Sequence, residues 1–135
     1  MALQFSDAVR NARLDAIETA IGVSAVLKIY DLTAGAPANC AAAITGTVLA
    51  TLSLPSDYMA AASGGSKAKS GTWQDASADA TGVADFFRLF ASDGTTCHAQ
   101  GTVGTSGTDM IVDNTSLNSG QSFTINTFTF NEANA

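Results

Sequence analysis

Residues 6–22, SDAVRNARLDAIETAIG, separate a helical segment from a body with the pattern of short strands. Ser6 is a preferred N-cap residue, and the acid at position 7 lies favourably at the positive end of the helix dipole. Gly22 suits the position just after a helix, where a left-handed backbone is common. The large apolar residues of the segment recur at helical spacing and form one stripe: Leu14, Ile17 and Ile21. The segment therefore predicts one short amphipathic helix.

The apolar stripe allows two placements of this helix. It can pack against the sheet of its own domain, or it can extend with Leu3 and Phe5 as an arm that binds a neighbouring subunit. In both cases the chain divides into an N-terminal arm and helix, residues 1–22, and a single globular β-domain, residues 23–135. A chain of 135 residues is long enough to bury one hydrophobic core.

After Gly22, short runs of β-forming residues alternate with turns of small residues. These runs predict strands at residues 24–32, 47–54, 68–74, 83–91, 95–103, 109–113 and 121–130. Asp93-Gly94 is a strong signal for a hairpin between the fourth and the fifth strand. About seven strands at this spacing predict an all-β fold, an antiparallel β-sandwich with a jelly-roll-like body and an N-terminal α-helix.

The strand expected at residues 83–91 is the most apolar one. One of its faces carries Phe87 and Leu89, and the other carries Phe86, Arg88 and Phe90. An antiparallel strand with one side in water normally alternates with polar residues, so we expect the second face to meet another protein. With the arm and the helical stripe, this face completes the predicted interface: Leu3, Phe5, Leu14, Ile17, Ile21, Phe86, Arg88 and Phe90.

The last expected strand carries a break in its alternation. Phe123 and Ile125 have odd positions, whereas Phe128 and Phe130 have even ones. Because successive side chains of a strand point to opposite faces, a regular strand would expose one of the two pairs. A β-bulge near residues 126–127 is predicted to return both pairs to the core.

The composition favours a binding role over catalysis and argues against some classes of partner. The net charge is −6, and six basic residues spread along the chain cannot neutralise a row of phosphates, so we expect no nucleic-acid partner. The acidic balance argues against an anionic membrane surface, and the apolar runs are too short to span a bilayer. The first residues lack the regions of a secretory signal, so we expect the protein to be made and used in the cytoplasm, or to leave it by cell lysis.

Few side chains could carry a reaction, and we expect no enzyme activity, metal or cofactor. His98 is the only candidate general base, and it follows Cys97 in an expected strand, where neighbours are poorly placed to form a dyad. One His and two Cys are too few ligands for zinc, and the acids do not match a calcium loop. Cys40 and Cys97 are expected to be free thiols that behave as small hydrophobic residues, with one disulfide between them as the alternative.

Four stretches of the chain resemble a known group of proteins. Residues 5–22, 56–73, 82–90 and 94–98 are similar to small uncharacterised proteins encoded in the structural-gene modules of tailed bacteriophages and prophages. The resemblance spans most of the chain and brings no known catalytic residues. It implies a component of the virion, assembled in the cytoplasm of the host bacterium. By analogy with small β-rich phage proteins, we expect a capsid decoration or cement protein that binds at junctions between capsid subunits.

The expected partners follow from this resemblance. They are the major capsid protein or other virion proteins, and further copies of the chain in a dimer or trimer. A tail or head–tail connector component is the alternative within the same class. A carbohydrate-binding β-sandwich module is the alternative of another class, with Tyr30, Tyr58 and Trp73 as its stacking platform.

Overall fold

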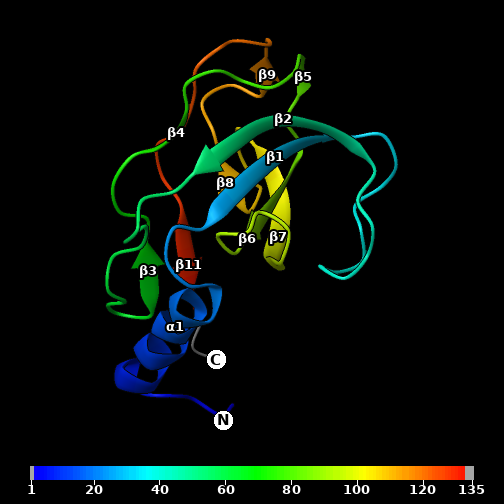
Figure 1. The fold of residues 1–135 in the computed structure, drawn as a ribbon. Helices are drawn as coiled ribbons and strands as arrows, with labels where there is room; N and C mark the ends of the chain where they lie inside the picture. Colours follow the sequence, from blue (N-terminus) through cyan, green and yellow to red (C-terminus); the bar gives the residue numbers. More distant parts are fainter. Residues whose placement is uncertain (1, 133–135) are drawn as a thin grey trace.

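A computed structural model describes residues 2–132 and shows a mostly β structure with one helix (Figure 1). Residue 1 of the expected N-terminal arm and residues 133–135 of the expected β-domain lie outside the described part. Helix α1 spans Asp7–Ile21. The strands of the described part are β1 Val26–Leu32, β2 Gly46–Ser53, β3 Ser66–Ala68, β4 Trp73–Asp75, β5 Gly82–Val83, β6 Phe86–Phe90, β7 Cys97–Gly104, β8 Met110–Ile111, β9 Ser116–Leu117, β10 Phe123–Ile125 and β11 Thr129–Asn131.

Helix α1 begins and ends where the sequence predicts. Ser6 is the N-cap, and its Oγ accepts a hydrogen bond from the backbone N–H of Val9 at 3.3 Å. Gly22 adopts a φ of +89° and donates its N–H to the carbonyl oxygen of Glu18 at 2.9 Å. A residue with a Cβ would be strained at this φ, so the glycine sets the end of the helix.

The largest sheet has five strands in the order β2-β1-β6-β7-β8. β1 lies between β2 and β6 and pairs antiparallel with both, so that Leu27 faces Leu52 on one side and Leu89 on the other. β6 continues into β7 through the predicted hairpin, where Gly94 adopts a φ of +69°. The carboxylate of Asp93 accepts hydrogen bonds within this turn and its pKa is lowered to about 2, first by the hydroxyl of Thr96.

β7 and β8 run parallel, so the expectation of a wholly antiparallel sheet is wrong at this edge. The loop between them returns the chain alongside β7 and places Met110 opposite Val103. Asp109 holds this loop, because its carboxylate accepts hydrogen bonds from the backbone N–H and the hydroxyl of Thr102 at 2.9 and 3.0 Å.

Several expected strands are broken into shorter ones with different partners. The stretch expected at residues 68–74 forms β3 and β4, with Gly71 at a φ of +72° between them. β3 pairs with β11 and β4 pairs with β10. The stretch expected at residues 83–91 forms β5 and β6. β6 belongs to the large sheet, whereas β5 pairs with β9 in a separate two-stranded sheet. Because a regular strand cannot turn from one partner to another, each change of partner requires a break that the hydrophobic pattern does not reveal.

The break in the last expected strand has a cause other than the predicted bulge. Residues 126–128 leave the sheet and separate β10 from β11. Phe123, Ile125 and Phe128 are buried, and Phe130 packs against the core. Both apolar pairs therefore face the core as expected, but they do so on two separate strands.

A row of aromatic rings joins the large sheet to the short strand pairs. Phe128 packs against Trp73 and Phe87 with ring centroids 5.8 Å from each, and against Phe130 at 4.9 Å. Trp73 is fully buried and donates from Nε1 to the carbonyl oxygen of Tyr58 at 3.2 Å. The core thus lies between β1, β2 and β6 on one side and β4, β10 and β11 on the other.

Phe128→Ala should lower the free energy of unfolding by about 3–5 kcal/mol, because it removes a ring that three other rings contact and leaves a cavity. Urea denaturation measures this change. Val83→Ala is the matched control, since Val83 is 53% exposed, and it should change the free energy by less than about 0.5 kcal/mol. A loss below about 1 kcal/mol for Phe128→Ala would contradict the central position of this ring.

Candidate interaction surfaces

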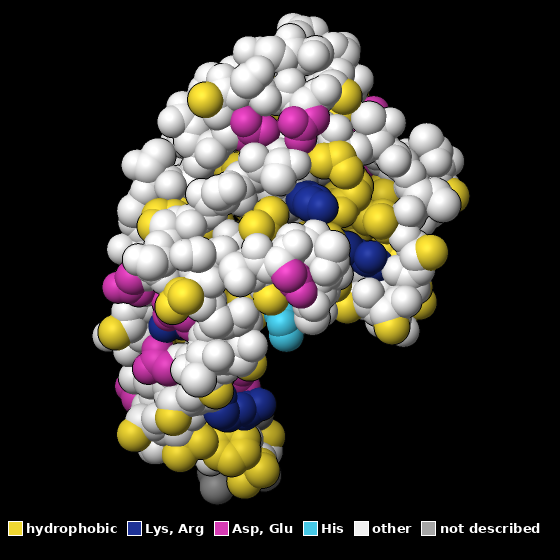
Figure 2. All heavy atoms as spheres, in the orientation of Figure 1, with side chains coloured by type: hydrophobic (Ala, Val, Ile, Leu, Met, Phe, Trp, Pro, Cys, Tyr) yellow, Lys and Arg dark blue, Asp and Glu magenta, His cyan; other side chains and the backbone are white. Residues whose placement is uncertain are grey.

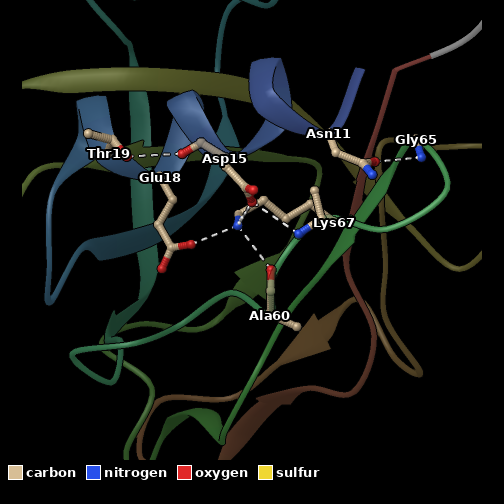
Figure 3. A network of polar contacts seen from close by, with 8 residues as sticks. Asn11, Asp15, Glu18, Thr19, Ala60, Gly65 and Lys67 are labelled. Carbon is tan, nitrogen blue, oxygen red and sulfur yellow. Dashed lines mark hydrogen bonds and ion pairs between the residues drawn. The ribbon is translucent and has the colours of Figure 1, made fainter. Parts of the chain in front are cut away.

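Helix α1 is fastened to the body by the buried ammonium group of Lys67 in β3 (Figure 3). Lys67 is 2% exposed. Its Nζ donates to Asp15 Oδ1 at 2.7 Å, to Glu18 Oε2 at 2.9 Å and to the carbonyl oxygen of Ala60 at 2.9 Å. An ammonium group has three protons, so these three acceptors satisfy it. The two carboxylates can meet one lysine because side chains three residues apart share a helix face.

These contacts shift the pKa values of Asp15 and Lys67. The hydrogen bond from Lys67, and then the one from the N–H of Ala62, lower the pKa of Asp15. Burial by itself lowers the pKa of Lys67, but the hydrogen bonds to Asp15 and Glu18 outweigh it and raise the pKa. Asp15 and Lys67 are therefore each held in the charged form, and the attraction between them favours the docked helix.

The turn before β3 makes a second contact with the helix. Ser63 and Ser66 exchange backbone hydrogen bonds across Gly64 and Gly65. The N–H of Gly65 donates to Asn11 Oδ1 at 2.9 Å (Figure 3). Gly65 has a φ of +78°, and a Cβ at this position would overlap the guanidinium group of the nearby arginine on the helix. Gly65 therefore lets the helix approach the turn closely.

A pocket of about 590 Å³ lies beside this network. Its walls include three carboxylates, Asp15, Glu18 and Asp57, and two of them are already bonded to Lys67. Tyr58 is fully buried near it, and its Oη has no hydrogen-bond partner within residues 2–132. Burial, and then the charge of Glu18, raise the pKa of Tyr58 to about 12. The pocket wall is thus acidic, with its one lysine used to hold the helix.

The outer face of β6 is covered by the chain itself. Phe86, Arg88 and Phe90 are 3%, 5% and 6% exposed. The connection between β1 and β2, residues 33–45, lies against this face, and Arg88 donates from Nη2 to the carbonyl oxygens of two residues in it, at 3.0 and 2.8 Å. The second apolar face is therefore explained within the chain, and these three residues are not exposed as the predicted interface requires.

Loop 33–45 is held by a covalent bond as well. Cys40 in the loop forms a disulfide with Cys97 at the start of β7, with their Cα atoms 5.4 Å apart. The expectation of two free thiols is wrong, and the alternative of one bridge is correct. Gln100 adds a third attachment, because its Nε2 donates to the carbonyl oxygen of Pro37 at 2.9 Å.

The structure separates the two parts of the predicted interface. The helical stripe, Leu14, Ile17 and Ile21, faces the core of its own chain. Leu3 and Phe5 lie before the helix and are 76% and 40% exposed. Figure 1 places this N-terminal segment at the end of the molecule opposite β5 and β9, away from loop 33–45. Of the two placements considered for the helix, packing on its own body is the observed one.

The remaining candidate residues have structural surroundings. His98 is exposed in β7, and Cys97 beside it is part of the disulfide and is therefore not a thiolate nucleophile. Tyr30, Tyr58 and Trp73 are 4%, 0% and 0% exposed, so they do not form an open platform on which a sugar ring could stack. Within residues 2–132, His, Cys, Asp and Glu side chains form no group of three or more that could hold a metal ion. The described part also contains no helix with the length and hydropathy needed to cross a membrane.

Comparisons with protein-family models, with curated proteins and with solved structures found no match.

The sequence pattern did not predict two of the contacts described above. The sequence contains one weak signal for the ion pairs of Lys67. Two acids of the helix, Asp15 and Glu18, lie beside its apolar stripe, where a basic residue of the body can reach them. The sequence contains no signal for the attachment of Arg88 to loop 33–45, because the acceptors are backbone carbonyl groups, which every residue carries.

Lys67→Met should lower the free energy of unfolding by about 1–3 kcal/mol at pH 7, because a buried carbonyl and two carboxylates lose their shared donor. Lys67 holds the folded-state pKa of Asp15 below its usual 3.8, so this contribution is present above that value and disappears as the pH falls through the folded-state value. The difference from wild type should therefore narrow in acid.

Urea denaturation between neutral and acidic pH measures both effects. Lys69→Met is the control, since its Nζ donates to the carbonyl oxygen of Gly71 at an exposed site and its loss should change less than about 1 kcal/mol. Equal stability of Lys67→Met and wild type at pH 7 would show that the ammonium group does not hold the helix.

Reduction of the Cys40–Cys97 disulfide should lower the free energy of unfolding by about 4 kcal/mol, from the loop-closure entropy of cysteines 57 residues apart. The amides of loop 33–45 should also exchange faster with solvent. Urea denaturation and hydrogen exchange, each with and without reductant, measure the two effects. The double variant Cys40→Ser, Cys97→Ser should have the same free energy of unfolding as the reduced protein, and the reductant should not change it. Identical results for both redox states would exclude a role of the bond in holding the loop.

Proposed function

We propose that this protein is a structural component of a bacteriophage virion, and specifically a capsid decoration protein that stabilises the head at junctions between capsid subunits. The similarity of residues 5–22, 56–73, 82–90 and 94–98 to proteins of phage structural-gene modules supports the proposed class. The proposed partners are the major capsid protein or other virion proteins, together with further copies of this chain in a dimer or trimer.

The observation that carries the proposal is the exposed apolar N-terminal end. Leu3, Phe5 and Val9 are 76%, 40% and 43% exposed. Figure 2 shows hydrophobic side chains gathered at the end of the molecule that Figure 1 assigns to the N-terminus and α1. Exposed large apolar side chains that lie together are typical of a surface that binds another protein. The fastening of α1 by Lys67 supports this use, because a helix held in one position loses little further freedom on binding.

The proposed contact gains its strength from repetition over the capsid. Burial of apolar surface contributes roughly 25 cal/mol per Å², so a contact of a few side chains is weak by itself. A symmetric oligomer would place several such ends on one junction, and a shell repeats the junction many times. The net charge of −6 supports solubility before assembly.

We propose that the short pairs β3–β11 and β4–β10 act as the second layer of a jelly-roll-like sandwich over the five-stranded sheet. The row of aromatic rings between the two sets of strands supports this assignment. Because disulfides rarely persist in a reducing cytoplasm, we propose that the Cys40–Cys97 bond closes after cell lysis, when the virion is already assembled.

The protein should co-sediment with expanded empty capsids of the phage that encodes it. Replacement of two exposed side chains, Leu3→Ser with Phe5→Ser, should weaken this binding by about a hundredfold or more, because each buried apolar side chain contributes on the order of 1.5 kcal/mol or more and every 1.4 kcal/mol corresponds to about a factor of ten. Val83→Ser is the matched control, since Val83 is an exposed apolar residue at the opposite end of the molecule.

Absence of the wild-type protein from the capsid pellet would remove the decoration proposal. Labelled antibodies on intact virions would then distinguish a tail or head–tail connector position from the head. Equal loss of binding in Val83→Ser and in the arm variant would show that the N-terminal end is not the contact.

A further inference from the structure

Strand β11 has one paired edge and one free edge. Within residues 2–132 it pairs with β3 alone, in a two-stranded sheet. The carbonyl oxygen of Phe128 and the N–H of Glu132, on either side of β11, also bond to residues that flank β3, at 2.8 and 2.9 Å. Because hydrogen bonding alternates along an antiparallel strand, Thr129 and Asn131 direct their backbone N–H and C=O groups away from β3. These groups have no hydrogen-bond partner in the described part of the chain.

The edge strand β2 of the large sheet shows how the chain covers an edge elsewhere. The N–H of Thr51 donates to Asp75 Oδ2 at 2.9 Å, and the carbonyl oxygen of Leu49 accepts from the N–H of Asp79 at 2.7 Å. Residues 75–79 thus occupy hydrogen-bonding groups that β2 would otherwise present to another chain. Uncovered edges tend to pair with a further strand, and the outer edge of β11 has no such cover within residues 2–132.

The free edge of β11 borders a hollow of about 450 Å³, and both Thr129 and Asn131 line it. Three rings also line it, and their centroids lie 5.8 Å apart between Phe87 and Phe128 and 4.9 Å apart between Phe128 and Phe130. In Figure 1, β3 lies on one side of β11, and β6 and β7 lie on the other. Backbone groups that point away from β3 therefore point toward the hollow, where apolar surface is also available.

The charge at the hollow limits what fits there. Asp109 is the only charged residue among the described residues that line it. Its Oδ2 is used by Thr102 at 2.9 and 3.0 Å, whereas its Oδ1 has no hydrogen-bond partner and no Lys or Arg within residues 2–132 pairs with it. A guest with a positive charge beside its apolar groups is therefore complementary to this place.

We propose that the edge of β11 and the adjoining hollow bind an extended, basic segment of a partner protein by strand addition. The main chain of the segment would pair with Thr129 and Asn131 and add a third strand to the β3–β11 sheet. Apolar side chains at every second position would contact the phenylalanine rings, and a lysine or arginine would lie beside Asp109. This inference does not rest on the proposed role in a virion, because it concerns the form of the bound segment and not the source of the partner.

The test is a titration of the purified ¹⁵N-labelled protein with the synthetic peptide acetyl-Lys-Thr-Val-Thr-Val-Thr-amide. Its valines supply the apolar face, and its lysine supplies the charge. Saturable shifts of the amide signals of Thr129, Phe130 and Asn131 are expected, with a dissociation constant on the order of 0.1–1 mM. The same peptide with methylated backbone nitrogens cannot donate main-chain hydrogen bonds and should bind about tenfold more weakly or less. Equal binding of the two peptides, or linear shifts with the first one, would overturn the proposal.

Two variants test the two parts of the site. Thr129→Pro removes an N–H that points away from β3, a position at which an edge strand tolerates proline, and it should weaken binding about fivefold. Asp109→Asn should weaken binding of the lysine peptide about fivefold, and should not change binding of a matched peptide with glutamine in place of lysine.

The control variant is Val83→Ala in β5, away from β11 (Figure 1), and its dissociation constant should equal that of the wild type. Urea denaturation confirms that each variant is folded before titration. A wild-type dissociation constant in both Thr129→Pro and Asp109→Asn would overturn the assignment of the site to this edge.

A further peptide tests the other occupant, which is the N-terminal arm of a second copy of the chain. Its sequence, Ala-Leu-Gln-Phe-Ser-Asp, is that of residues 2–7. Because this peptide lacks a basic residue, it should bind more weakly than the lysine peptide. Tighter binding of the arm peptide would overturn the assignment to a basic partner segment and would assign the groove to self-association.

Discussion

The burial of β6 on both of its faces is the constraint on which the rest of the structure depends. All five residues, Phe86–Phe90, are buried, although an antiparallel sheet commonly leaves one face in water. The chain must therefore supply a cover for each side. The inner cover is the row of aromatic rings around Phe128, and the outer cover is loop 33–45. The disulfide and the contacts of Arg88 are needed because this loop has no secondary structure to hold it in place.

The helix is attached by a different kind of interaction. Its apolar stripe contributes two buried side chains, Leu14 and Ile21, which is a small area for a helix of 15 residues. The ammonium group of Lys67 adds three charge-assisted or polar contacts at one point, and Gly65 lets the helix lie close to the turn before β3. Charged contacts of this kind fix orientation more than they add stability, since desolvation of the lysine offsets much of the attraction. The result is a helix held in one direction with its N-terminal end exposed.

The cover over β6 and the attachment of α1 decide which apolar surfaces stay exposed for binding. The face of β6 that resembled an interface in the sequence is used internally. Three of the exposed large apolar side chains, Leu3, Phe5 and Val9, belong to the N-terminal segment and the first turns of α1, whereas Val23, Val83 and Ile111 lie elsewhere. The outer face retains Lys28 and Arg88 without acidic partners in the described part of the chain. The end of the molecule near the N-terminus is therefore the part best suited to apolar contact with a partner.

The sequence by itself determined the features that depend on neighbouring residues. Ser6 and Gly22 bound the helix, Asp93-Gly94 forms the hairpin, and the change of parity after Ile125 marks a real interruption, because caps, turns and alternation are local properties of the backbone. Tertiary structure alone decided which residues far apart in the chain meet. It joined Cys40 to Cys97, gave Lys67 its two acids, divided the long strands among several partners and folded loop 33–45 over Arg88. The apolar pattern of β6 shows that both faces are buried, but burial has the same signature whether the cover is another protein or the chain itself.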